Sequence, residues 1–151
     1  MLGCIFCKIV SGKFESATVW ENDDFVALLD INPNTKGMTL VVSKEHYDSY
    51  AVDMDDEMYG KFFFAAKEVS KMLEKGLGVQ RVAIVMEGLG INHAHIKLYP
   101  IHGLSKKFEA FWNNETVYFD KYQGYISTQV GPKKEMMELK KLAKEIQEKS
   151  K

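Results

Sequence analysis

Asn92-His93-Ala94-His95-Ile96-Lys97-Leu98-Tyr99-Pro100 is the most informative run in this chain of 151 residues. It carries two of the four histidines, and its polar and apolar side chains alternate with the period of a β-strand. We therefore predict that His93, His95 and Lys97 lie on one face of a strand, while the apolar residues between them pack on a core. Two imidazoles and an amine on a rigid strand indicate a reactive or metal-binding site.

Four other segments have the composition of strands and are bounded by turn-forming residues, namely 18–21, 25–31, 38–43 and 81–86. The mostly apolar segment 38–43 is expected to be a central strand. Glu87-Gly88-Leu89-Gly90 is expected to make a tight hairpin connection between the strand 81–86 and the strand 93–100.

Two segments have the apolar period of an amphipathic helix. The first has apolar residues at spacings of four and three from Met58 to Met72, with Asp53 or Asp55 as its cap and Gly76 or Gly78 at its end. The second begins near Pro132 and carries an apolar stripe. These elements predict an α+β fold with a mostly antiparallel sheet, one inserted helix and one C-terminal helix. We expect a domain over residues 1–131 and the C-terminal helix over 132–151.

Composition excludes several classes of function. A net charge of −1 argues against a general nucleic-acid-binding surface, which needs a basic excess. The apolar runs are far shorter than the roughly 18 residues of a membrane span, so we expect no membrane partner. The N-terminus lacks the features of a signal peptide, which makes a cytoplasmic location the expectation. Two cysteines cannot form a disulfide framework.

Cys4-Ile5-Phe6-Cys7 is a C-x-x-C pair with three interpretations. A redox pair would follow a strand and open a helix. Two packed, inert thiols are a second interpretation. Zinc binding is the third, and it needs two more ligands because structural zinc is tetrahedral. His46 and His93 could supply them if the strands beside them are neighbours, although His46 could equally be an ordinary surface residue.

Taken together, four segments in order resemble the histidine triad (HIT) family of nucleotide hydrolases and transferases. They are Cys4–Ile9, Phe25–Asp30, Lys36–His46 and His93–Pro100, the last being similar to the H-x-H-x-H signature and the proline three residues after it. The resemblance implies a HIT-like sheet that a homodimer extends across both subunits. It also implies a structural zinc ion held by Cys4, Cys7, His46 and His93.

The same resemblance implies a role for His95 as the nucleophile. Its imidazole would attack the α-phosphorus of a purine nucleotide or dinucleoside polyphosphate and form a nucleotidyl-histidine, which water hydrolyses. One ring nitrogen must then be held protonated so that the other is free to attack. The remaining substrate contacts implied are Asp30 and Ile31 at the ribose, and Gly88, Gly90 and Asn92 at the phosphates. The alternative is that His95 only packs beside a metal site.

Three features depart from the family pattern. Lys97 replaces the third histidine; it is a plausible phosphate contact but a poor reversible acid–base at neutral pH, and it could also be a plain solvent-facing lysine on an edge strand. Met38 replaces an upstream histidine and offers no proton. The loop 87–92 is short. These departures favour the alternative of a catalytically impaired nucleotide-binding or regulatory module.

Overall fold

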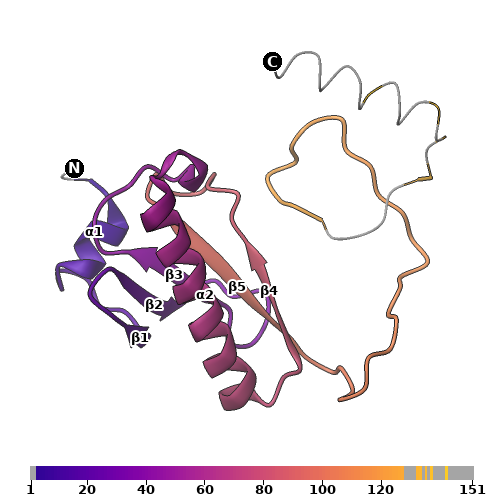
Figure 1. Cartoon of the computed structure of the whole chain (residues 1–151), viewed down its shortest axis with the longest axis horizontal. Helices are drawn as coiled ribbons and strands as arrows, with labels where there is room; N and C mark the ends of the chain where they lie inside the picture. Colours follow the sequence, from indigo (N-terminus) through magenta and orange to yellow (C-terminus); the bar gives the residue numbers. More distant parts are fainter. Residues whose placement is uncertain (1–2, 128–131, 134, 136, 138–141, 143–151) are drawn as a thin grey trace. The chain divides into compact units, whose positions relative to one another are not determined.

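The computed structural model describes residues 3–127, 132–133, 135, 137 and 142. The chain divides into two compact units, Met1–Lys107 and Phe108–Lys151. The helices and strands named below all lie in the first unit (Figure 1). Most of the helix predicted over 132–151 falls outside the described residues, and the domain boundary after residue 131 stays a prediction.

One antiparallel sheet forms the centre of the first unit. Its strands are β1 (Thr18–Glu21), β2 (Phe25–Leu29), β3 (Thr39–Ser43), β4 (Arg81–Val85) and β5 (His95–Ile101). They lie in the order β1-β2-β3-β5-β4, and every neighbouring pair is antiparallel. The predicted α+β fold and the central place of β3 are confirmed.

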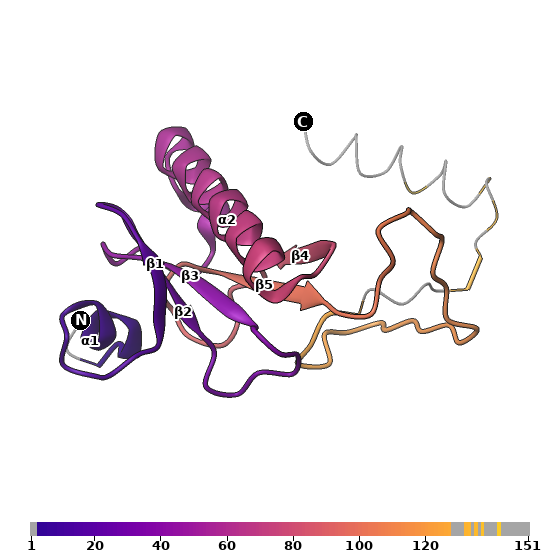
Figure 2. The ribbon, with the colours of Figure 1, turned by 90° about the horizontal axis from the view of Figure 1, so that it is seen from below.

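The helix α2 (Asp56–Leu77) lies across one face of the sheet (Figure 2). It begins where the Asp55 side chain accepts a hydrogen bond from the backbone N–H of Met58, and it ends at Gly78, which has a left-handed backbone. The predicted stripe is wrong at its last position: Met72 is 38% exposed, whereas Leu73 is buried. A helix turns once every 3.6 residues. One turn after Val69, the side chain that returns to the buried stripe is therefore closer to residue 73 than to residue 72.

The opposite face of the sheet packs against a short helix, α1 (Ile5–Val10), which the sequence did not predict. A short 3-10 helix, η1 (Ala51–Asp53), precedes α2. Successive residues of β2 and β3 face opposite sides of the sheet, and both sides are buried. This explains why the two strands are apolar almost throughout. The apolar side chains on the α1 face are Phe6, Val26, Leu28, Met38, Leu40 and Val42.

The connection between β4 and β5 differs from the predicted tight hairpin. It spans residues 86–94, and β5 begins at His95, so His93 precedes the strand and does not belong to it. The cause is a hydrogen bond outside the sheet. The Ala94 N–H donates to the carbonyl oxygen of Tyr47 at 2.9 Å, which holds this segment near the loop after β3.

Among the described residues, no helix is long and apolar enough to cross a bilayer.

Replacing Phe62 with alanine tests the main core. Phe62 and Phe25 are fully buried, and their rings stack with centroids 5.0 Å apart. We expect Phe62→Ala to lower the free energy of unfolding by about 3–5 kcal/mol, measured by urea denaturation. Phe64→Ala on the same helix is the control, because Phe64 is 71% exposed. Equal losses in the two variants would contradict this packing.

Candidate metal centre and active site

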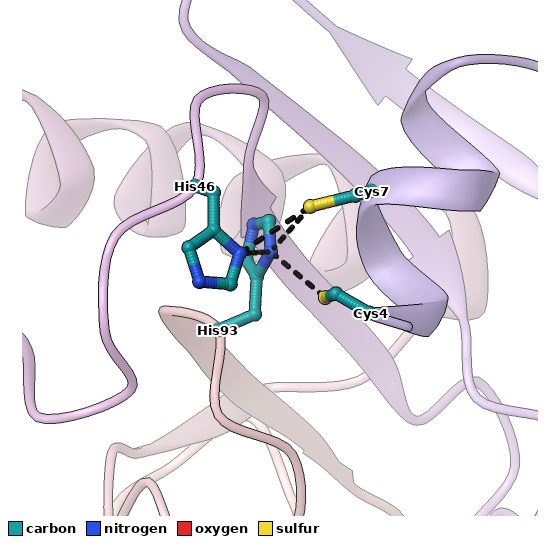
Figure 3. Close-up of side chains that lie close together, drawn as sticks. All are labelled: Cys4, Cys7, His46 and His93. Carbon is teal, nitrogen blue, oxygen red and sulfur yellow. Dashed lines mark hydrogen bonds between the residues drawn. The ribbon is translucent and has the colours of Figure 1, made fainter. Parts of the chain in front are cut away.

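Four potential metal ligands meet beside α1. Cys4 caps this helix, Cys7 lies within it, His46 follows β3 and His93 precedes β5. Figure 3 shows both sulfur atoms pointing toward the two imidazole rings. The Nδ1 atom of His93 lies 3.3 Å from Cys4 Sγ, 3.5 Å from Cys7 Sγ and 3.1 Å from His46 Nδ1. His46 Nδ1 is also 3.3 Å from Cys7 Sγ.

These donor positions fit a tetrahedral zinc ion. All four ligand atoms lie within 4.8 Å of one another. Zn–S bonds of about 2.3 Å and Zn–N bonds of about 2.0 Å at tetrahedral angles would separate the donors by about 3.3–3.8 Å. The C-x-x-C pair does open a helix, as a redox motif would, but its two sulfurs face two imidazoles. The group can therefore hold a metal ion, and its two sulfurs and two nitrogens are the donors typical of structural zinc.

A hydrogen bond and burial both favour the form of the His93 ring that binds a metal. Its Nε2–H donates to the carbonyl oxygen of Ser43 at 2.7 Å, which leaves Nδ1 with a lone pair directed at the sulfurs. The residue is fully buried, and burial lowers the pKa of its imidazole. The neutral form is the one that binds metal. Burial also raises the pKa of the Cys7 thiol, so a metal ion would have to displace the proton from that sulfur.

His95 is oriented by the backbone carbonyl of His93. Its Nδ1 lies 2.7 Å from the His93 carbonyl oxygen, which only accepts, so Nδ1 carries the proton and Nε2 keeps its lone pair. The side chain is 3% exposed, and the Phe6 ring packs against it with centroids 5.4 Å apart. Phe6 also meets the His93 ring edge-on at 5.6 Å. A lone pair on Nε2 is one condition that a nucleophilic imidazole must meet.

Lys97 lies two residues beyond His95 and forms an ion pair with Glu87. The two side chains are 23% and 11% exposed. β5 lies between β3 and β4, so Lys97 is not on an edge strand. The interpretation of Lys97 as a plain solvent-facing lysine on an edge strand is wrong, because its strand is internal and its side chain is mostly buried and paired with Glu87.

Asp30 and Ile31 lie directly after β2. The Asp30 N–H donates to the Met38 carbonyl oxygen at 3.0 Å, and its carboxylate accepts from the Asn32 N–H at 2.7 Å. The Asp30 side chain therefore shapes its own turn while staying partly exposed. Ile31 is 88% exposed, which makes it available to a ligand but gives it no fixed position.

The loop before β5 is tied to the segment that carries His46. Gly88 has a φ of +70°, and a side chain there would come within 2.5 Å of the Ser49 carbonyl oxygen. The Asn92 amide accepts from the Ser49 N–H at 3.0 Å and donates to the Asp48 carboxylate at 2.9 Å. Asn92 therefore fixes the loop, and Gly90 is exposed.

Two residues of this region were missed by sequence reasoning. Glu87 was assigned only to a turn, since nothing in the local pattern shows which cation it meets. Phe6 was passed over as a spacer between the cysteines, although an aromatic residue inside a metal-binding pair is a signal that it packs on the site.

Zinc content tests the metal centre. We expect about one zinc per chain in protein purified without chelators, and loss of most of it in Cys7→Ser, because three donors hold the ion far more weakly than four. Elemental analysis measures the ratio, and His102→Ala is the control, since His102 is an exposed histidine bonded to the Lys36 carbonyl. Zinc-free wild-type protein, or equal zinc in Cys7→Ser, would reject the assignment.

Comparisons with known proteins agree with this geometry. An uncharacterized HIT-like protein of Methanocaldococcus jannaschii is 39% identical over 102 residues, which cover 64% of this chain and 78% of the relative. A solved structure from Streptococcus mutans UA159 has a TM-score of 0.70 at 29% identity, covering all of this chain and 87% of that one. A zinc-bound histidine triad family protein from Mycobacterium smegmatis has a TM-score of 0.63 at 26% identity, covering 71% and 81%. The family model described as HIT domain matches residues 11–108, so the chain belongs to the HIT family.

Proposed function

We propose that the protein is a nucleotide phosphohydrolase or nucleotidyl transferase that acts at the α-phosphate through a nucleotidyl-histidine at His95. The observation that carries this proposal is the hydrogen bond from His95 Nδ1 to the His93 carbonyl, 2.7 Å long. It holds the ring in the tautomer whose Nε2 can attack without first losing a proton. Membership of the HIT family supports the same chemistry.

The reaction would proceed in two displacements. His95 Nε2 attacks the α-phosphorus, a P–N bond forms, and the bond to the leaving group breaks with its electron pair on the departing atom. That atom takes a proton from water or from the Lys97 ammonium. Water, or an acceptor alcohol in a transfer, then attacks the same phosphorus. The P–N bond breaks, the attacking oxygen gives up a proton to water or, where Lys97 donated in the first step, back to its amine, and the neutral imidazole is restored.

Other residues would bind the substrate. Lys97 would contact a phosphate oxygen as a fixed positive charge. Asp30 and Ile31, at the exposed end of β2, would contact the ribose and its base. Backbone N–H groups near Gly88 and Gly90 would approach the phosphates, a role that glycine permits because no side chain intervenes. Asn92 would support this loop through Ser49 and Asp48.

A bound zinc ion would act as a structural crosslink. Cys4 and Cys7 would hold α1, and with it Phe6, against the strand that carries His95. His93 would be fixed at the same time, and its carbonyl sets the tautomer of His95. The nucleophile in the proposed chemistry is an imidazole that needs no metal, so these four ligands would position the site and take no part in the displacement.

A second candidate function is a nucleotide-binding or regulatory module with little or no turnover. The observation that favours it is the packing of Met38, which is 6% exposed in the apolar cluster on the α1 face and offers no proton. The Lys97 charge is also partly engaged by Glu87. Such a protein would bind nucleotides in the same place.

The ligand and the assembly are part of the proposal. A purine nucleotide or dinucleoside polyphosphate would be the ligand, in the cytoplasm. The second protomer of a homodimer would extend the sheet, and β4 is suited to this because it lies at one edge of the sheet.

Turnover by a His95→Ala variant tests the mechanism. Wild-type protein should release nucleoside monophosphate from an adenosine phosphoramidate or a diadenosine polyphosphate, measured by chromatography. His95→Ala should be slower by roughly 10³-fold or more, because the attacking nitrogen is gone. His102→Ala should keep the wild-type rate, since His102 is an exposed turn residue after β5.

Two other outcomes are informative. Equal rates in wild type and His95→Ala would contradict the nucleophile assignment. Nucleotide binding without any release by the wild type would support the second candidate function over the first.

A further inference from the structure

We propose that Glu87 is a positioning residue, which holds the Lys97 ammonium on the His95 face of the sheet for phosphate binding. This inference rests on the proposed function, because it concerns how the same site binds a phosphate. It is prompted by the ion pair between the two side chains.

The backbone places the two charges opposite each other. Lys97 lies in the middle of β5 and pairs in register with Val85, the last residue of β4. Glu87 follows two residues later, immediately before Gly88. The close approach of Gly88 to the Ser49 carbonyl restricts where the loop can lie, so the carboxylate is presented from a constrained backbone.

The surroundings of Lys97 make a partner necessary. Its cross-strand neighbours are Leu40 on β3 and Val85 on β4, and Leu40 is buried. The Lys97 side chain is 23% exposed, and a charge largely withdrawn from water is costly unless an opposite charge offsets it. Glu87, whose side chain is 11% exposed, supplies that charge.

The wider cluster shows why this ammonium matters. Tyr99, the next residue on the same face of β5, is within electrostatic reach of Lys97, Glu87 and Asp30. Of the three charged groups that act on Tyr99, Lys97 carries the only positive charge, and Glu87 and Asp30 are carboxylates. A phosphate entering next to His95 would therefore depend on Lys97 for attraction. The ammonium has three N–H donors, so its bond to Glu87 does not by itself prevent donation to a phosphate oxygen.

A double-mutant cycle on nucleotide binding tests the inference. The proteins are wild type, Glu87→Gln, Lys97→Met and the double variant, and the probe is adenosine monophosphate, titrated calorimetrically at one fixed ionic strength. We expect Glu87→Gln and Lys97→Met each to weaken binding by about tenfold, and the double variant to bind like Lys97→Met alone, because Glu87 acts only through Lys97. The double variant replaces the pair with neutral side chains, so it should fold even if one single variant does not.

Two further variants separate positioning from a general charge effect. Glu15→Gln removes the same charge from an exposed residue and should bind like the wild type. Glu87→Asp keeps the carboxylate and should recover part of the lost affinity. A purely structural role would change the melting temperature without this pattern in the dissociation constants.

The contrary outcomes are distinct from one another. Tighter binding by Glu87→Gln would mean that the carboxylate repels phosphate, and it would overturn the inference. Additive losses in the double variant, or binding by Glu87→Gln equal to that of Glu15→Gln, would overturn it as well and leave the proposed function standing. A wild-type protein that does not bind adenosine monophosphate would overturn both.

Discussion

The position of His93 is the constraint on which the site depends. Its Nε2–H bonds to the Ser43 carbonyl on β3, its Nδ1 faces the sulfur atoms of α1, and its own carbonyl accepts the Nδ1–H of His95. One residue thus joins the sheet, the candidate metal ligands and the His95 imidazole. Because all three contacts come from one buried residue, a shift of His93 would disturb the metal centre and the proposed nucleophile together.

The loops on either side of His93 reinforce this position. Asn92 and Gly88 contact the segment around Ser49, which follows the ligand His46, and Phe6 packs between His93 and His95 from α1. Elements distant in sequence therefore converge on one short stretch of backbone. Lys97, which stands where the family pattern has a histidine, lies in the same region, and Glu87 balances its charge.

Sequence reasoning predicted the strands and a mostly antiparallel sheet, and it offered Asp53 or Asp55 as the cap, of which Asp55 is the one the structure uses, because these features depend on local periodicity and turn chemistry. It placed His93 on the strand, since alternation continues through Ala94, and it could not foresee the bond from Ala94 to Tyr47 that ends the strand at His95. The metal ligands were grouped through the family resemblance, as residues so far apart in sequence show no local spacing. The Glu87–Lys97 pair was missed because it depends on the register of β4 with β5.

The most direct test of this account is the tautomer of His95. Long-range ¹H–¹⁵N spectra of histidine-labelled protein at neutral pH, with His95→Ala used to assign the signals, report which ring nitrogen carries the proton. The account predicts a proton on Nδ1, held by the His93 carbonyl, and an unprotonated Nε2. A proton on Nε2 with a bare Nδ1 would contradict it, because the nitrogen required for attack would be blocked.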